Sequence, residues 1–568
     1  MRLENIIKMF KKIWPELLVV ILAVVFFFGT SAYNFLAQSP DFIKWSSPDE
    51  TANYLSAKQY ASTGELSMII EDNAIADGIV APRSMRADSV VVKPVSFLGM
   101  IILYGFLAKI FGLGVLPYLT PFFSALGLIF FYLLIKRLFN RQVALLSTCL
   151  LTFFPVYIYY SARSFFHNEL FVVFLMVGFY LAILASQTSA VLRQKILYWF
   201  YAFLSGLLIG LAVTVRTSEL VWLGPMLLLI WLFNLKRWQV MRPLLFAYAF
   251  VLAFAPIFFY NFILYGSPLA SGYPDMDKSV TAIVSGGGGL VANAFQAKFD
   301  QTKQFLKQIY HSFFYFGFKP SQSWQMFKHF TLEMFPWLWY LSGAGLVIFC
   351  FKFWCRPKAD LIYLSSFILS AVILVLYYGS WQYTDSINPD SFTLGNAYTR
   401  YWLPLYLFAL PLASLAILRL TKIFKFKSII ISSRLALVLV ICGLGVVYTL
   451  YGTNDSLVPS YYSLQASRQE FKQVLAVTEP DSLIITRYHD KLFFPERKVI
   501  VALFNDDAMN ERYARLAKRW PIYYYNFNLK PEELAAINQE KLKSRGLIMK
   551  LKQSVTSQFS LYQLEFIK

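Results

Sequence analysis

Long apolar stretches recur along this chain, and most of them are close to the length needed to cross a membrane. They occupy residues 17–36, 95–111, 116–136, 142–160, 168–186, 196–215, 218–235, 243–264, 336–354, 360–380, 401–420 and 430–452. A helix needs about 20 apolar residues to cross the ~30 Å hydrocarbon core of a bilayer. The pattern therefore predicts a mainly α-helical, polytopic membrane protein.

Basic clusters between the apolar runs predict how the helices are oriented. They are Lys136/Arg137/Arg141, Arg193/Lys195, Lys236/Arg237/Arg242, Lys352/Arg356/Lys358 and Lys422/Lys425/Lys427. All of them face the cytoplasm if one early run does not cross, since cytoplasmic loops are rich in Lys and Arg. The 95–111 run is the candidate, because it is short and contains Lys109. We therefore predict about eleven crossings of the cell membrane, with a cytoplasmic N-terminus.

This orientation leaves the longer polar segments outside the cell, at residues 37–115, 265–335, 381–400 and beyond 453. The 265–335 segment contains the flexible stretch SGGGG and then QAKFDQTKQFLKQIYHSFF, which predicts a helix on the membrane surface. We expect residues 1–452 to form the transmembrane domain and residues 453–568 a small extracytoplasmic α/β domain. Its predicted strands are SLIIT, KVIVALF, PIYYYN, GLIMKL and FSLYQLEFI.

The net charge and the cysteines exclude two other classes of protein. The formal charge of +20 falls largely in the short cytoplasmic loops, so it does not indicate a nucleic-acid-binding protein. The four cysteines lie in apolar runs or in a basic loop, at Cys149, Cys350, Cys355 and Cys442. They indicate neither a disulfide framework nor a thiolate metal site.

The stretch WSSPDETANYLS follows the first apolar run and contains an adjacent acidic pair. Ser47-Pro48-Asp49-Glu50 has the form of a capping box with proline at the first helical position. Capping explains Glu50, and on this ground alone Glu50→Gln should be mild because glutamine can also cap. Capping gives Asp49 no obligatory partner, so Asp49 is a candidate catalytic group.

Other charged side chains lie where apolar runs are expected to reach the outer surface, and charges at membrane depth are costly. They are Lys93, Arg163, His167, Glu169, Arg216, Glu219 and Arg400. A carboxylate can act as a general base on a hydroxyl, and Arg or Lys can bind a phosphate. Structural roles stay open: interfacial anchoring of Lys93 and Arg400, helix capping at 167–169, and an ion pair between Arg216 and Glu219.

The DMD stretch offers a weak metal site. Asp275 and Asp277 could bind a divalent cation through carboxylate oxygens. Their position after GSPLASGYP is more typical of a turn, and we predict no cofactor.

Five stretches together resemble the GT-C superfamily, in particular its protein O-mannosyltransferase and aminoarabinose-transferase-like group. They are SPDETANYLSAKQYASTGELS, KPVSFLGMIILYGFLAKIFG, GLLIGLAVTVRTSELVWLGP, YNFILYGSPLASGY and AYTRYWLPLYLFALPLASLA. The resemblance implies an inverting transfer from a polyprenyl-phosphate sugar, with Asp49 as base and Glu50 beside it. It implies Lys93 and Arg400 near the donor phosphate, and the further site candidates are Arg163, His167, Glu169, Arg216 and Tyr401.

The chain departs from this family at three motifs. His167-Asn168-Glu169 stands where members often carry an aspartate, and TAN replaces the His-Phe-Gly that follows the acidic pair in protein-mannosylating members. The WWDYG motif of oligosaccharyltransferases is absent. These departures argue against a protein acceptor and against N-glycosylation.

A lipid-linked sugar is the natural donor outside the cell, because nucleotide sugars are made inside it. The expected partners are a polyprenyl-phosphate sugar, a hydroxyl acceptor (glycan, lipid or protein) and membrane lipid. The alternatives are a transporter or flippase of lipid-linked sugars and a non-catalytic scaffold. A transporter would place more charges deep within its helices, and no internal repeat is apparent.

Overall fold

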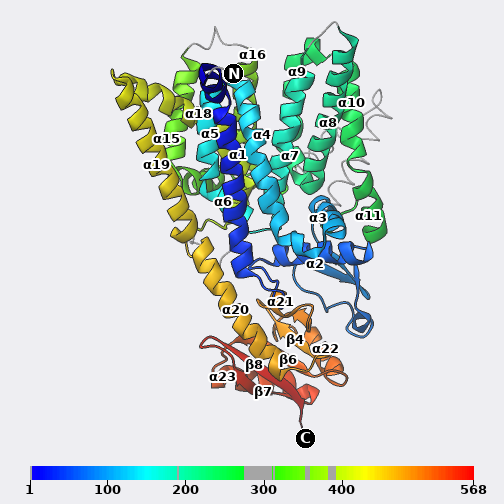
Figure 1. Cartoon of the computed structure of the whole chain (residues 1–568). Coiled ribbons are helices and arrows are strands. Elements are labelled where there is room, and N and C mark those ends of the chain that lie inside the picture. Colours follow the sequence, from blue (N-terminus) through cyan, green and yellow to red (C-terminus); the bar gives the residue numbers. More distant parts are fainter. Residues whose placement is uncertain are drawn as a thin grey trace.

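The computed structural model describes residues 3–187, 191–238, 240–273, 310, 314–351, 358–381 and 392–567. A bundle of long helices forms one end of the molecule and a small α/β domain the other (Figure 1). In the described part of the chain, nine helices are long and apolar enough to cross a membrane, or up to eleven if each of two bent pairs is one span. The predicted fold class, a mainly α polytopic protein, is confirmed.

The spans come from helices in every part of the bundle. They are α1 (Leu3–Ala37), α4 (Leu119–Leu138), α7 (His167–Ala185), α8 (Leu192–Val215), α9 (Leu220–Trp238), α10 with α11 (Met241–Leu252, Ala255–Tyr265), α16 (Lys358–Gly379), α18 (Leu403–Leu420) and α19 (Lys427–Tyr451). Short helices α14 (Pro320–Phe327) and α17 (Ala397–Tyr401) precede α15 and α18.

The two bent pairs break at prolines. Helices α5 (Arg141–Thr152) and α6 (Pro155–Ala162) meet at 54°, and residues Pro320–Glu333 meet α15 (Pro336–Cys350) at 97°. Proline cannot continue the preceding helix but suits the first turn of the next. Pro155 and Pro336 occupy that position in α6 and α15.

The 95–111 run forms the short helix α3 (Leu98–Phe111) rather than a long span. Its 14 residues rise about 21 Å, which is less than the ~30 Å core. Helix α3 packs closely on α2, since a Cβ at Gly105 would lie 2.8 Å from the Ala57 carbonyl oxygen. This length agrees with the predicted non-crossing helix.

Between the bundle and the α/β domain lie α2 (Pro48–Thr63), α3 and a small antiparallel sheet (Figure 1). The sheet has the order β1-β3-β2, with strands β1 (Met68–Ile69), β2 (Met85–Asp88) and β3 (Val91–Pro94). All of these elements come from the first long polar segment of the sequence.

The C-terminal domain follows α20 (Leu457–Val477) and contains a five-stranded sheet of order β5-β4-β6-β8-β7. Its strands are β4 (Leu483–Thr486), β5 (Lys498–Val501), β6 (Ile522–Phe527), β7 (Leu547–Ser554) and β8 (Phe559–Phe566), and its helices include α21 (Asp490–Phe493), α22 (Asp507–Ala517) and α23 (Pro531–Ala536). Each strand coincides with one of the five strand-like runs of the sequence.

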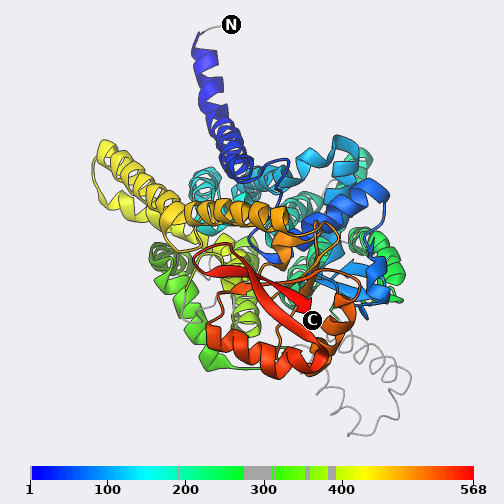
Figure 2. The same ribbon diagram turned by 90° about the horizontal axis from the view of Figure 1, so that it is seen from below.

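Part of the first polar segment completes this domain. Ala81 forms a parallel bridge with Ile500 on the edge strand β5. Ala76 and Val80 are buried in the same apolar core as Leu483. Seen from below, the blue segment lies against the orange and red domain (Figure 2). The two regions are about 400 residues apart in the sequence, so the domain is joined to the bundle by packing as well as by α20.

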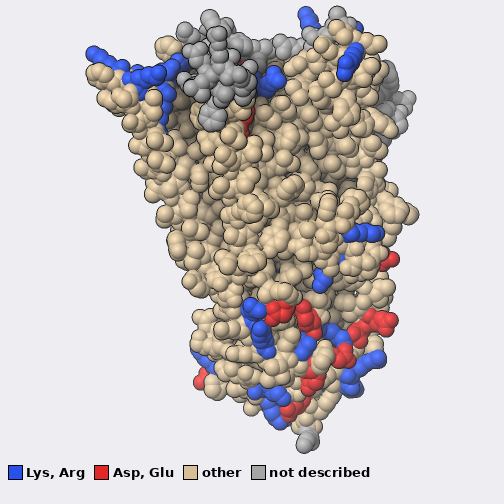
Figure 3. Space-filling model, viewed as in Figure 1, with Lys and Arg blue, Asp and Glu red and all other residues tan. Residues whose placement is uncertain are grey.

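Charge is distributed unevenly along the molecule. Figure 3 shows Lys and Arg at the end away from the C-terminal domain, both signs of charge on that domain, and mostly uncharged side chains between. By the positive-inside rule, this distribution predicts that the C-terminal domain faces the outside of the cell.

Cysteine labelling tests this orientation. In a chain with its own cysteines replaced by serine, single cysteines at Arg137, in the last turn of α4, and at Lys518, directly after α22, lie toward opposite ends of the molecule (Figure 1). We expect a membrane-impermeant thiol reagent to label position 518 but not 137 in intact cells, and both after permeabilisation. Labelling of position 137 alone in intact cells would show that the topology is the reverse of the predicted one, with the candidate site on the cytoplasmic side.

Candidate active site

Helix α2 begins as its sequence predicts. Ser47 is its N-cap, the Ser47 N–H donates to Glu50 Oε2 at 3.0 Å, and the Asp49 N–H donates to Ser47 Oγ at 3.3 Å. Gly64 ends the helix with φ of +81°, a left-handed conformation that glycine adopts without strain. The capping box fixes where the acidic pair lies on the helix.

The two acids of the pair have opposite environments. Glu50 is fully buried and forms an ion pair with Arg163, whose Nε also donates to Glu50 Oε1 at 3.3 Å. Arg163 in turn donates to the Tyr159 hydroxyl and lies over the Phe166 ring. Both oxygens of Glu50 are thus occupied, and the side chain is sealed from an incoming substrate.

Asp49 is exposed and only partly occupied. Its Oδ1 accepts a 2.6 Å hydrogen bond from the Ser84 hydroxyl, which lies just before β2. No described residue donates to Oδ2. This carboxylate therefore keeps one oxygen available for a substrate hydroxyl.

Asp49 lies within electrostatic range of Tyr273, as do aromatic and basic side chains from distant parts of the chain. Tyr273 interacts electrostatically with Asp49, Tyr401, Arg216 and Arg400. Burial raises the pKa of the Tyr273 hydroxyl, and the Asp49 carboxylate raises it further. Tyr273 therefore marks the space that these four residues share.

Arg216 is held by three side chains. Its Nε donates to Glu219 at 2.9 Å, and its other nitrogens donate to Asn168 Oδ1 at 3.4 Å and the Tyr378 hydroxyl at 3.2 Å. The guanidinium also lies 4.5 Å from the centre of the Tyr401 ring. The predicted Arg216–Glu219 ion pair is present.

Arg400 and His167 line the same space. The Arg400 guanidinium lies over the rings of Phe166 (4.8 Å) and Tyr401 (5.2 Å), and the Arg400 carbonyl accepts from Asn168 Nδ2 at 3.0 Å. His167 Nε2 lies 3.1 Å from the Phe97 carbonyl oxygen. Since a carbonyl can only accept, Nε2 carries the hydrogen in this contact.

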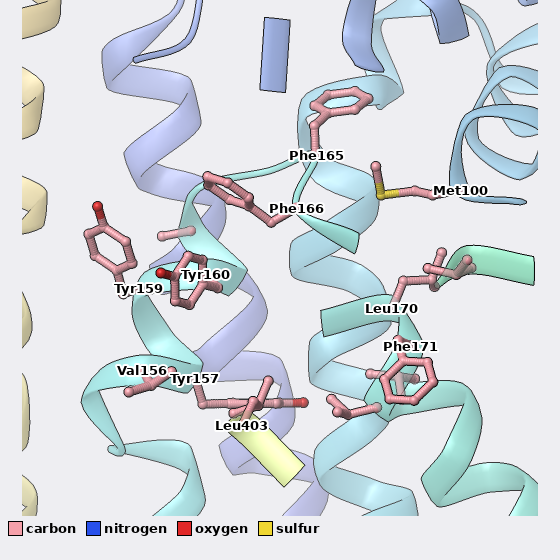
Figure 4. Packing of buried hydrophobic residues seen from close by; sticks show 14 of the residues in the cluster. Met100, Val156, Tyr157, Tyr159, Tyr160, Phe165, Phe166, Leu170, Phe171 and Leu403 are labelled. Carbon is pink, nitrogen blue, oxygen red and sulfur yellow. The ribbon is translucent and has the colours of Figure 1, made fainter. Parts of the chain in front are cut away.

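Behind this group, α6 and the turn after it form an aromatic wall. Figure 4 shows Tyr159 and Tyr160 on α6, with Phe165 and Phe166 in the turn. Phe165 has φ of +68°, a strained conformation for a bulky residue. The turn places Arg163 against Glu50 and Phe166 beneath Arg400.

Two predicted site residues make their contacts elsewhere. Lys93 on β3 forms an ion pair with Asp88, donates to the Leu264 carbonyl at 2.6 Å and lies 5.3 Å from the Tyr265 ring. Glu169 is fully buried near Tyr104 and Tyr157, and neither of its oxygens has a hydrogen-bond partner in the described part of the chain.

Asp275 and Asp277 lie outside the described residues, as do SGGGG, Cys355 and most of the predicted surface helix. Among the residues that the structure does describe, there is no group of three or more His, Cys, Asp or Glu side chains that could hold a metal ion.

Sequence reasoning did not identify two residues of the candidate site, Ser84 and Tyr273. Ser84 has no motif of its own, and its contact with Asp49 depends on the turn before β2. Tyr273 ends the YNFILYGSPLASGY stretch, so its place in a matching stretch was the one available signal.

Comparison with known proteins identifies the fold. Residues 97–260 match the family model described as dolichyl-phosphate-mannose-protein mannosyltransferase. The structure resembles the oligosaccharyltransferase of Archaeoglobus fulgidus in its apo form, with a TM-score of 0.56 and 12% identity over 94% of this chain and 71% of that chain. The chain has the GT-C fold. The predicted resemblance is thereby confirmed.

Two further GT-C structures that resemble the chain contain a polyprenyl phosphate. AglB from A. fulgidus, in complex with an inhibitory peptide and a dolichol-phosphate, has a TM-score of 0.51 and 13% identity over 91% of this chain and 70% of that chain. ArnT from Cupriavidus metallidurans, bound to undecaprenyl phosphate, has a TM-score of 0.50 and 11% identity over 96% of this chain and 97% of that chain. No curated protein matches the sequence.

Proposed function

We propose that this GT-C protein transfers a sugar from a polyprenyl-phosphate donor to a hydroxyl acceptor outside the cell. The transfer inverts the configuration at the anomeric carbon of the sugar. Asp49 takes the proton from the acceptor hydroxyl, the hydroxyl oxygen bonds to the anomeric carbon, and the lipid phosphate leaves with the electrons of the broken bond. The observation that carries the proposal is the exposed Asp49 carboxylate within electrostatic range of Tyr273, a position that it shares with Arg216 and Arg400.

The environments of the two acids decide which of them is the base. A general base must reach the proton that it removes, at about 2.6–3.2 Å. Glu50 is buried with both oxygens bound, whereas Asp49 is exposed and has a free oxygen. Asp49 is therefore the base, and Glu50 holds the helix that carries it.

The basic residues suit the leaving group. A guanidinium can donate two parallel hydrogen bonds to a phosphate, and a site sheltered from water strengthens them. The Arg216 guanidinium is already paired with Glu219, and the Arg400 guanidinium lies over the rings of Phe166 and Tyr401. We assign Arg400 to the donor phosphate, with Lys93 as a second candidate.

Replacement of Arg400 tests this assignment. Because lysine cannot reproduce the bidentate contact, we expect Arg400→Lys to raise the donor KM about tenfold. Lys93→Met should raise it less, since Lys93 is already paired with Asp88. Titration of a synthetic polyprenyl-phosphate sugar gives both values. Unchanged donor KM in both variants would make these residues interfacial anchors.

An apolar cavity supports a donor with a long hydrocarbon chain. It has a volume of about 340 Å³ and lies among α4, α7, α9, α16 and α18. Its lining includes Met176, Met226, Phe408 and Trp222, and the Trp222 indole donates to Glu219, the partner of Arg216. The cavity thus reaches Trp222, next to the partner of Arg216, and extends to Arg137 and Trp238 at the other end of the bundle. Its mostly apolar lining suits an isoprenoid chain better than a free nucleotide sugar.

Lipid analysis tests the proposed function. Cells that lack the protein should accumulate a polyprenyl-phosphate sugar that is consumed when the protein is restored. Restoration with Asp49→Asn should leave that lipid at the level of the deleted strain. If the Asp49→Asn protein restored the lipid profile fully, a transporter would be the better interpretation, because transport needs no general base.

A further inference from the structure

Asp49 is held by two neighbouring structures, the turn that contains Ser84 and the start of α2. Two adjacent residues at the start of α21, in the C-terminal domain, contact these structures. Asp490 is fully buried, and its two oxygens accept from the Arg83 backbone N–H at 2.8 Å and from Arg83 Nε at 2.9 Å. Arg83 Nη2 donates in addition to the Tyr488 carbonyl at 2.8 Å. Arg83 is thus fastened to the C-terminal domain by both its backbone and its side chain.

The residue after Arg83 is Ser84, whose hydroxyl donates to Asp49. Ser84 has φ of +62°, a left-handed conformation that costs free energy for a residue with a side chain. Its carbonyl accepts from the Val95 N–H at 3.0 Å, so it is held from the β3 side as well. The strained backbone points the hydroxyl at the carboxylate.

Lys491, the residue after Asp490, contacts the start of α2. The Lys491 ammonium donates to the Ser46 carbonyl, directly before the N-cap of α2. Burial, and then the Arg83 guanidinium, lower the pKa of Lys491 to about 8. A lysine is rarely desolvated without a specific contact, and here that contact lies three residues before Asp49.

We propose that Asp490 and Lys491 are positioning residues for the catalytic base, so that the C-terminal domain is a working part of the active site. Asp490 acts through Arg83 and Ser84, and Lys491 acts through the start of α2. The inference rests on the proposed role of Asp49. Its physical basis is that a misplacement of a catalytic group by about 1 Å can cost about a hundredfold in rate.

Ser84→Gly and Asp490→Asn test the proposal in the full-length protein. Glycine suits the left-handed backbone and removes only the hydroxyl, so the Ser84→Gly protein should melt at or above the wild-type temperature. For both variants we expect kcat to fall about tenfold with the donor KM nearly unchanged, since one hydrogen bond to a charged group is lost.

Arg515→Gln is the matched control. Arg515 also joins the C-terminal domain to the first polar segment, through a 2.9 Å ion pair with Asp77, but both side chains are exposed and neither contacts α2. Its kcat should equal that of the wild type. Wild-type kcat in both Ser84→Gly and Asp490→Asn would overturn the inference.

The Asp49→Asn background separates the inference from the proposed function. If Asp490 acts through Asp49, Asp490→Asn should lower the residual rate of Asp49→Asn no further, whereas independent effects would multiply. A multiplied loss overturns the positioning role. Full activity of Asp49→Asn alone would instead overturn the proposed function, and the two failures are therefore distinguishable.

Discussion

Asp49→Asn is expected to lower sugar transfer by at least about a hundredfold, because general-base catalysis typically contributes ~10²–10⁴-fold. Asparagine keeps the shape of the side chain and can still accept the Ser84 hydrogen bond, but it cannot take up the proton of the acceptor hydroxyl. The donor KM should change little, since Asp49 makes no contact with the proposed phosphate cations in the described structure. Initial rates with purified protein and a synthetic lipid-linked sugar give both quantities.

Glu65→Gln is the matched control for this variant. Glu65 is an exposed acid just beyond the opposite end of α2, so its replacement removes the same charge from the neighbourhood of that helix. Its activity should equal that of the wild type. An Asp49→Asn protein that keeps more than about a tenth of the wild-type rate would contradict general-base catalysis by Asp49.

The sequence was sufficient for the local features of the fold, because they depend on neighbouring residues. The apolar runs predicted the spans, the Ser47–Glu50 stretch predicted the cap, and five alternating runs predicted β4 to β8. The short α3 was also predictable, since its length falls below the bilayer thickness. Each of these features follows from periodicity, length or one capping contact.

The remaining features depend on contacts between distant residues, which a single sequence does not specify. The bridge between Ala81 and Ile500 joins segments that share no motif, so the joint core of the first polar segment and the C-terminal domain was not predicted. Likewise, the acidic pair was identified, but the partner of Glu50 was not, because Arg163 lies 113 residues away. The environments of Lys93 and Glu169 were not predicted for the same reason, because they too depend on residues far away in the sequence.

The ion pair of Glu50 and Arg163 changes what its removal should do. From the capping box alone, Glu50→Gln should be mild, since glutamine can accept that role. In the folded protein, however, the side chains of Glu50 and Arg163 are about nine-tenths buried or more. Glu50→Gln leaves the guanidinium without its counter-charge in a dry environment.

We therefore expect Glu50→Gln to destabilise the protein by about 3–5 kcal/mol, the usual result of removing one partner of a buried ion pair. The double variant Glu50→Leu with Arg163→Met should recover much of that loss, because no unpaired charge then remains buried. Arg515→Gln breaks an exposed ion pair and should cost no more than about 1 kcal/mol. Unfolding of the detergent-solubilised variants, followed by circular dichroism, provides the comparison. A Glu50→Gln protein as stable as the wild type would show that capping alone accounts for Glu50, and that Arg163 finds another counter-charge or water when its partner is removed.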